Sequence, residues 1–568
     1  MGEERNNAGI IFKVIIALFV ASLSIVTINK GFFMDEAGLL ATYKGIYQGN
    51  RMFIDSWGPL QMGGLITYPL FALYYECIGG FLEAYGIGFV LFMRGCYLLI
   101  RFLVALYLYL TIRKTKYKDG AFVAALVYYC FFTSFKNLSY KSICDLAIML
   151  FICWGIRFFY NNNPWYFILM GVATCVAIIA YPVMIIFPFF ILVYFILMGI
   201  KGYDTLAPMI IYIVTCIIIG IAVLLYLQLT AGIMNILPQL QYIEDSAYKN
   251  PMYIRVGKII ASYLAFGVVA YIPVVIIELI KKIRHVDEKI TFVVLSLYWI
   301  LFMAGLIAVR PLSTSMSRFL YGCIVLFWWC PYIFRDKESS EYTRIGHYKL
   351  PDFDEGFIVQ FIFVVSAVSQ LVWAIATNQG VAIPANMAIY VVVAIMMKCG
   401  DEGEGLALLK IAVTAAAVFF MGIWVAEGDG GYSDIFEART MVTEGAFAGI
   451  ELDETDYSNN RDCYELINRH VTSSDRLYVV YGFAYSAYLD TDALQGVGQP
   501  YSRAGKGQTR VLDYWRVNPE NQADYILVDT ANKYYDEYHG GETELYVQEN
   551  YEAIDELESF ILYKRKSY

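Results

Sequence analysis

An acidic pair, Asp35-Glu36, follows directly after the first long hydrophobic segment of the chain, residues 10–29. The chain thus places two carboxylates where that segment ends, within Gly31-Phe-Phe-Met-Asp-Glu-Ala-Gly38. A carboxylate in such a position can act as a general base that removes a proton from a hydroxyl nucleophile. Acidic residues are also favoured in the first turn of a helix, where they need no catalytic role. Because acidic residues at a membrane boundary are candidates for a functional role, we favour the interpretation as a catalytic base over that of a first helical turn.

Basic residues recur in the other segments that we expect on the same face as this pair. A phosphate group carried by a lipid needs cationic donors at the membrane boundary, and Arg can contact it through two hydrogen bonds. A single Lys or Arg near the end of a membrane helix more often extends into the headgroup layer. The candidates are Arg51, beside Asp55 in the first outer loop, Lys141 in the second, Lys249 and Arg255 in the third, and Arg310 and Arg318 in the fourth.

The elements that must position these residues are membrane helices. The chain has 568 residues, of which 59% are hydrophobic and 16% are charged, whereas soluble proteins carry about 25% charged residues. Repeated apolar runs predict a mainly α, polytopic membrane protein with thirteen spans. The predicted spans are 10–29, 87–112, 119–135, 142–160, 164–180, 182–200, 206–230, 257–280, 290–309, 318–334, 356–376, 382–398 and 405–425.

The basic loops set the orientation. With the N-terminus inside, the cytoplasmic loops include Arg113–Lys118, Lys281–Arg284 and Arg335–Lys349, as the positive-inside rule predicts. Thirteen spans then place the C-terminal region outside, on the face of Asp35-Glu36. The first outer loop, residues 30–87, is far longer than a connection requires. Segments 36–47 and 65–78 within it have the composition of helices that lie in the interface plane.

Two regions follow from this division, residues 1–426 in the membrane and 427–568 outside it. The second region has 27 acidic and 12 basic residues, so it is unsuited to binding nucleic acid or anionic lipid. We predict an α/β fold there, with strands at 477–481, 525–528 and 560–563 and helices at 462–471 and 546–557.

The cysteines and histidines argue against a disulfide in the outer region and against a zinc site. Only Cys463 lies in the outer region, so no disulfide can form within it. The four histidines are isolated and no zinc-ligand spacing occurs. We therefore expect no firmly implied cofactor, although Asp35, Glu36 and Asp55 have the oxygen ligands that a divalent cation prefers.

The order of the motifs resembles a known family. Met34-Asp-Glu-Ala, then Tyr47-Gln-Gly-Asn-Arg-Met-Phe-Ile-Asp55-Ser-Trp-Gly-Pro59, looks like the opening of polytopic GT-C glycosyltransferases. More narrowly, it resembles the group of protein O-mannosyltransferases, lipid A aminoarabinose transferases and their bacterial relatives. Tyr140-Lys-Ser-Ile-Cys-Asp145 resembles their second outer loop. Tyr481-Gly482, Pro500-Tyr-Ser-Arg503 and Ala523-Asp-Tyr-Ile-Leu-Val528 resemble the outer domain of bacterial members.

The resemblance implies an inverting transfer of a hexose or pentose from a polyprenyl-phosphate donor to the hydroxyl of a glycan, lipid or protein acceptor. Asp35 would be the general base, with Glu36 as second choice. The leaving phosphate would meet Lys141, Arg310 and Arg318, with Lys249 and Arg255 as further candidates, while Arg51 and Asp55 would orient the loop or contact the sugar. We expect a bacterial plasma membrane location. A secondary transporter and a non-enzymatic subunit of a glycan assembly system are the alternatives, but we find none of the internal repeats that transporters have.

Overall fold

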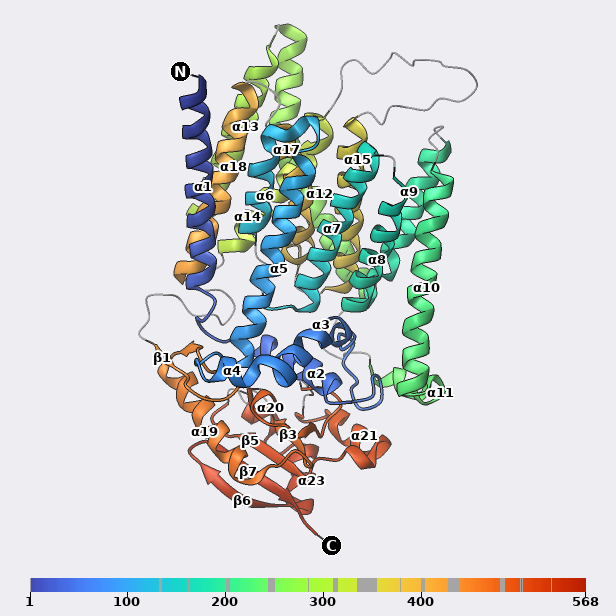
Figure 1. Cartoon of the computed structure of the whole chain (residues 1–568), viewed down its shortest axis with the longest axis vertical. Helices are drawn as coiled ribbons and strands as arrows, with labels where there is room; N and C mark the ends of the chain where they lie inside the picture. The colour runs from blue at the N-terminus through green and yellow to red at the C-terminus, as the bar shows by residue number, and fades with distance from the viewer. Residues whose placement is uncertain are drawn as a thin grey trace.

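The computed structural model describes residues 2–131, 135–161, 163–200, 205–243, 251–284, 286–309, 315–334, 355–377, 380–399, 404–427, 439–480, 486–500, 502, 504–532 and 534–567. The molecule is elongated (Figure 1). A bundle of long helices occupies one end, a layer of short helices lies across its base, and an α/β unit, which we call the tail, forms the other end. The N-terminus lies at the end of the bundle away from the tail.

The bundle consists of apolar helices that run along the long axis of the molecule. Within the described residues, nine helical segments are long and apolar enough to cross a membrane, and four shorter apolar helices accompany them. One of the nine, Gly63–Glu83, belongs to the layer across the base and not to the bundle. The bundle helices are α1 Gly2–Val26, α5 Phe89–Ile112, α6 Ala121–Cys130, α7 Tyr140–Asn161, α8 Trp165–Ala180, α9 Phe187–Ile200, α10 Leu206–Thr230, α12 Met252–Ile283, α13 Glu288–Val309, α14 Ser315–Ile333, α15 Glu355–Ala376, α17 Ile389–Lys398 and α18 Glu404–Glu427.

Each predicted span contains one of these helices, so the chain is a multi-pass membrane protein. The third predicted span holds only the ten residues of α6. The fifth and sixth spans meet at Tyr181, whose extended backbone ends α8 because the following residue is Pro182. Short helices complete the connections: η2 Lys116–Gly120, η3 Pro182–Ile186, α11 Ile233–Ile236, η4 Leu237–Tyr242, α16 Ala382–Ala385 and η5 Asn386–Ala388.

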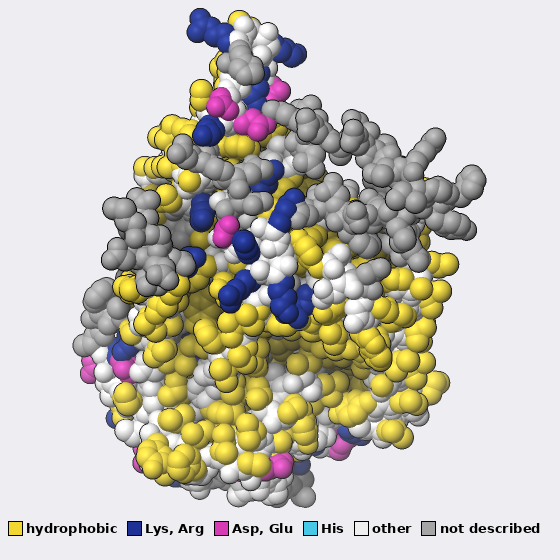
Figure 2. Space-filling view, turned by 45° about the horizontal axis from the view of Figure 1, so that its top comes forward, with side chains coloured by type: hydrophobic (Ala, Val, Ile, Leu, Met, Phe, Trp, Pro, Cys, Tyr) yellow, Lys and Arg dark blue, Asp and Glu magenta, His cyan; other side chains and the backbone are white. Residues whose placement is uncertain are grey.

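Lys and Arg side chains gather at the end of the bundle away from the tail, above a broad hydrophobic flank (Figure 2). This end carries exposed cations from two loops that the sequence assigns to the cytoplasm. They are Arg113, Lys114, Lys116, Lys118, Lys282 and Arg284. The charge distribution agrees with the predicted orientation, which stays a prediction.

The layer across the base comes from the first outer loop and consists of α2 Met34–Tyr47, α3 Gly63–Ala72, η1 Leu73–Ile78 and α4 Gly79–Glu83. Tyr68, Leu73, Phe81 and Tyr85 are exposed on the segment 63–85, as expected of a helix in the interface plane. Helix α2 differs from that expectation. Its residues from Glu36 to Ile46 are all buried, because the tail covers the face that the bundle does not.

The tail contains a five-stranded sheet with the order β4-β3-β5-β7-β6. Strands β4, β3 and β5 are parallel, and β7 and β6 form an antiparallel hairpin at one edge. The elements are β1 Thr440–Met441, β2 Glu451–Leu452, α19 Glu454–His470, β3 Arg476–Val480, α20 Ala487–Asp490, β4 Leu494–Gln495, α21 Arg510–Val517, η7 Pro519–Asn521, β5 Tyr525–Asp529, α22 Tyr535–Tyr538, α23 Glu542–Asn550, β6 Tyr551–Leu557 and β7 Phe560–Arg565.

The three predicted strands are present as β3, β5 and β7, and the predicted fold class is confirmed. The predicted helix at 546–557 is wrong after Asn550, because residues 551–557 form β6. Tyr551, Ile554 and Leu557 recur at three-residue spacing, which is typical of a helix. In the structure a register shift between Ala553 and Asp555 inserts one residue into the strand and produces the same spacing.

The tail and the layer of short helices share one hydrophobic core. Leu40 and Phe89 from the membrane region pack in the same buried cluster as Phe447, Leu477 and Leu527 from the tail. Main-chain hydrogen bonds reinforce this junction, because residues 29–31 and 88–90 pair with residues 446–451. The tail is therefore fixed against the outer end of the bundle.

Candidate active site at the outer end of the bundle

Asp35 lies in the first turn of α2. The helix begins at Met34, and the residue before it, Phe33, has an extended backbone. Its side chain is half-buried. Burial raises the pKa of this carboxyl group, and the ammonium group of Lys141 opposes that rise. A carboxyl group with a raised pKa is a stronger base when ionised than an exposed one, so the position suits proton abstraction.

Glu36 is in a different environment. Both its oxygens accept hydrogen bonds from Arg94 of α5, at 2.9 Å from Nε and 2.6 Å from Nη2. Both side chains are fully buried. The planar guanidinium thus binds both oxygens of the carboxylate at once and fixes its direction. The structure thus separates the two acids, with Asp35 half-buried opposite a lysine and Glu36 in an ion pair.

The turn that leads from α1 to Asp35 is held by two buried cations. Arg94 donates to two carbonyls of this turn besides binding Glu36, and Lys136 donates to two others. The four carbonyls belong to Thr27, Ile28, Lys30 and Gly31. Since carbonyls at the end of a helix lack partners and carry partial negative charge, two cations there fix the entry into α2.

Lys141 lies in the first turn of α7 and is almost completely buried. Its ammonium nitrogen lies 5.0 Å from the ring centroid of Phe135 and 5.8 Å from that of Tyr140. Tyr140 in turn contacts Tyr181 and Trp373. The cation that faces Asp35 is therefore surrounded by aromatic rings.

Two further predicted cations lie at the same end of the bundle. Arg318 is buried in the first turns of α14, and Arg255 in the first turn of α12 donates to the carbonyl of Thr377 at 3.2 Å. Helices α7, α12 and α14 thus begin at the outer end, where their dipoles add partial positive charge. Arg310 and Lys249 lie outside the described residues.

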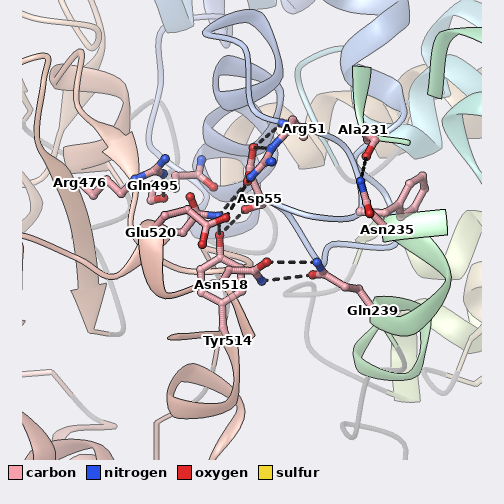
Figure 3. Close-up of polar contacts among 12 residues, drawn as sticks. Arg51, Asp55, Ala231, Asn235, Gln239, Arg476, Gln495, Tyr514, Asn518 and Glu520 are labelled. Atoms are coloured by element: carbon pink, nitrogen blue, oxygen red, sulfur yellow. Dashed lines mark hydrogen bonds and ion pairs between the residues drawn. The ribbon is translucent and has the colours of Figure 1, made fainter. Parts of the chain in front are cut away.

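Arg51 and Asp55 form an ion pair, with Nη2 and Oδ1 2.7 Å apart, and the backbone N–H of Arg51 also donates to Asp55 (Figure 3). The tail joins this pair. Asn521 donates to the carboxylate of Asp55 at 2.8 Å, and Tyr514 donates to its carbonyl. These bonds hold the pKa of Asp55 below its usual range, against the opposing effect of burial. Among the predicted site residues, this pair fixes the tail rather than facing Asp35.

A three-way joint lies next to this pair. Trp57 donates through Nε1 to Gln239 of η4 at 2.6 Å and stacks on Tyr242. Gln239 and Asn518 exchange two amide hydrogen bonds of 3.1 Å (Figure 3). Trp57 is completely buried, so it links the first outer loop, the loop between α10 and α12, and the tail.

Asp145, predicted within the second loop motif, lies deeper in the bundle. Its carboxylate is 3.3 Å from Arg101 Nη1 and accepts hydrogen bonds from Tyr128 and Tyr390. All these groups are buried, so Asp145 ties α5, α6, α7 and α17 together.

Sequence reasoning missed several residues of this region. Arg94 and Trp57 had no signal in their spacing, because their partners are remote in sequence. Asn137 is also missed: it is fully buried, and both atoms of its side-chain amide lack a hydrogen-bond partner in the described part of the chain. Within the described residues, no group of three or more His, Cys, Asp or Glu side chains is placed to hold a metal ion.

No family model matches the chain, and no curated protein matches it. Among solved structures it is similar to ArnT from Cupriavidus metallidurans bound to undecaprenyl phosphate, with 11% identity, a TM-score of 0.44 and 98% of each chain covered. It is also similar to the archaeal oligosaccharyltransferase AglB from Archaeoglobus fulgidus, in complex with an inhibitory peptide and a dolichol-phosphate. There the identity is 11%, the TM-score is 0.45, and 98% of this chain and 74% of that chain are covered.

Both are of the GT-C kind that the sequence resembles. With 11% identity and TM-scores below 0.5, these likenesses carry no conclusion about this chain. We therefore take the chemistry of the site from its own residues.

Proposed function

We propose that this protein transfers a sugar from a polyprenyl-phosphate donor to an acceptor hydroxyl at the outer face of the membrane. The observation that carries the proposal is the placement of Asp35. Its half-buried carboxylate, with a pKa raised by burial, lies at the outer end of a membrane bundle and faces the ammonium group of Lys141. A base beside a cation at a lipid boundary matches the two needs of this reaction, proton removal and anion stabilisation.

Asp35 acts on the acceptor in this proposal. Its carboxylate takes the proton of the acceptor hydroxyl while the oxygen attacks the anomeric carbon of the donor sugar. The bond between that carbon and the phosphate oxygen breaks, and the configuration inverts. Glu36 is unsuited to this step, because Arg94 occupies both its oxygens. We therefore assign it the task of holding the first turn of α2.

The leaving polyprenyl phosphate gains negative charge as the bond breaks. Lys141 is our first candidate to receive it, since its ammonium group interacts electrostatically with Asp35. Arg318 and Arg255, at the starts of α14 and α12, are the next candidates, together with Arg310 and Lys249. Preorganised cations in a site screened from water stabilise such charge by several kcal/mol, of the order of 3 kcal/mol for one donor.

The aromatic rings around Lys141 offer flat faces for a sugar or an isoprenoid chain. They do not distinguish hexose from pentose, and the acceptor is a glycan, a lipid or a protein. We place the reaction on the extracytoplasmic side of a plasma membrane, because exposed Lys and Arg residues gather at the opposite end of the bundle (Figure 2).

The proposal is tested with the purified protein in liposomes that contain the polyprenyl-phosphate sugars extracted from cells lacking it, with the envelope glycans, lipids and proteins of the same cells added as acceptors. A lipid-linked sugar that accumulates in those cells identifies the donor by mass spectrometry. We expect the wild-type protein to consume this donor and release polyprenyl phosphate. Asp35→Asn should reduce the rate about 10²–10⁴-fold.

Uptake of a solute by sealed liposomes with no covalent product would instead identify a transporter. A lack of any accumulated lipid-linked sugar, together with no release of polyprenyl phosphate by the wild-type protein, would overturn the proposed function. Full activity of Asp35→Asn would overturn the assignment of Asp35 as the base.

A further inference from the structure

Helix α2 carries Asp35 at its beginning and contacts the tail near its end. Lys44, on the third turn, has an almost fully buried ammonium group. It donates to the carbonyl oxygens of Leu489 at 2.9 Å and Thr491 at 2.7 Å. Leu489 lies in the last turn of α20 and Thr491 directly follows that helix, so a side chain of the first outer loop caps the main chain of the outer domain where α20 ends.

Other contacts reinforce this attachment. Gln48, one turn beyond Lys44 on the same face of α2, donates to the carbonyl of Asp492 at 2.9 Å. In the opposite direction, Gln495 of β4 donates to the carbonyl of Ala41 at 2.6 Å. Three hydrogen-bonding groups therefore connect one face of α2 to a continuous stretch of the tail, residues 489–495.

Charged and aromatic groups surround the ammonium group of Lys44. Asp492 lies 3.8 Å away and is mostly exposed, Asp490 is half-buried nearby, and the ring centroid of Tyr75 lies at 5.3 Å. Burial lowers the pKa of Lys44 to about 8, while the two aspartates raise it. A neutral amine still donates two hydrogen bonds, so the attachment to the two carbonyls does not depend on the charge of Lys44.

The two ends of α2 are held on different faces. The helix turns about 100° per residue, so Lys44 is rotated by about 80° from Glu36 around the helix axis. The two residues are also separated by about 12 Å along that axis. The ion pair of Glu36 with Arg94 fixes the position of one end. A second attachment at the other end, on another face, fixes the tilt and the rotation, and the direction of the Asp35 side chain follows that rotation.

We propose that Lys44 is a positioning residue that fastens α2 to the tail and so sets the direction of the Asp35 carboxylate. The inference rests on the proposed function, because it assigns the tail a part in the same reaction. It makes the outer domain a part of the machinery that positions the base. Misplacement of a catalytic group by about 1 Å costs about 10²-fold in rate.

The test uses full-length Lys44→Met, which keeps the apolar stem and removes the donors. Gln495→Leu removes an independent link from the tail side. Lys506→Met, at an exposed tail position, is the matched control. For each variant, kcat and KM for sugar transfer are measured per folded molecule, and hydrogen exchange is measured for the amides of α2.

We expect kcat of Lys44→Met to fall 10–100-fold with KM within about twofold, and α2 amides to exchange faster. Gln495→Leu should show the same pattern more weakly, and Lys506→Met should match the wild type. If Lys44→Met does not fold, Gln495→Leu decides the question. Unchanged exchange in α2, or unchanged kcat despite faster exchange, would overturn the inference.

Failure of the proposed function is recognised separately. In that case the wild-type protein transfers no sugar from any donor, so the kcat comparison cannot be made and the role in positioning a base is overturned with it. The exchange data then still report whether Lys44 fastens α2 to the tail.

Discussion

Replacing the two adjacent acids one at a time should separate catalysis from stability. Asp35→Asn removes a half-buried charge whose pKa is raised by burial. The neutral amide costs little to bury, so the free energy of unfolding should change by less than about 0.5 kcal/mol. Sugar transfer should fall about 10²–10⁴-fold, because the proposed general base is lost.

Glu36→Gln, in contrast, should lower the free energy of unfolding. The two oxygens of Glu36 lie 2.9 and 2.6 Å from nitrogens of Arg94, and neither residue is exposed. At an effective dielectric constant of about 20, the attraction over 2.6 Å is about 6 kcal/mol, part of which offsets desolvation. Loss of one partner leaves a buried guanidinium uncompensated, which costs about 3–5 kcal/mol. The unfolding midpoint should fall by about 3–4 °C, because the entropy of unfolding grows with chain length.

The assay follows the reaction of buried thiols with a fluorogenic maleimide during heating in detergent. Most of the eleven cysteines are buried free thiols, so unfolding exposes them. Transfer by each variant is measured at a temperature where it remains folded. The reasoning is refuted if Asp35→Asn keeps more than a tenth of the wild-type rate, or if Glu36→Gln unfolds at the wild-type temperature.

Three other predictions follow from the same contacts. Lys141→Met should lower kcat about 10²-fold and move the acid limb of the pH–kcat profile to higher pH, since Lys141 lowers the pKa of Asp35; an unmoved limb would contradict the contact. Trp57→Phe should lose the hydrogen bond to Gln239 and cost about 1 kcal/mol, measured as a lower unfolding midpoint with unchanged KM. Burial raises the pKa of Asp490 to about 7, above its unfolded value of about 3.9, so its contribution to stability is complete below about pH 3.9 and is lost as the pH rises through 7. The midpoint should therefore decrease from pH 5 to pH 8 in the wild type and less in Asp490→Asn, whereas equal slopes would exclude this residue as the cause.

Local patterns were sufficient to predict the elements of this fold. Apolar runs located a helix in each predicted span, and β-branched residues located β3, β5 and β7, because each signal lies within one element. Strand β6 was not predicted, because a register shift gives its apolar residues the spacing of a helix. The burial of α2 was not predicted either, because the residues that cover it lie in the tail, more than four hundred positions away in the sequence.

The site was predictable only in part for the same reason. The position of Asp35 at a membrane edge follows from the sequence, and the nearby Lys141 came from residue type and loop order. The different environments of Asp35 and Glu36 could not be predicted without knowing which residue binds Glu36. Arg94 lies 58 residues later in an apolar helix, and nothing in its neighbours indicates which carboxylate it meets. Pairings of this kind depend on which helices are adjacent in space.

The hydrophobic core shared by the tail and the first outer loop also sets an order of assembly during synthesis. Leu40 and Phe89 leave the ribosome early, whereas Phe447, Leu477 and Leu527, which complete their core, are made after the last membrane helix. The first outer loop therefore waits, incompletely folded, until almost the whole chain has been inserted. Contacts between segments so distant in sequence form late and slowly. A nascent or truncated chain accordingly holds Asp35 in an unfinished setting, and we expect the proposed activity only once synthesis is complete.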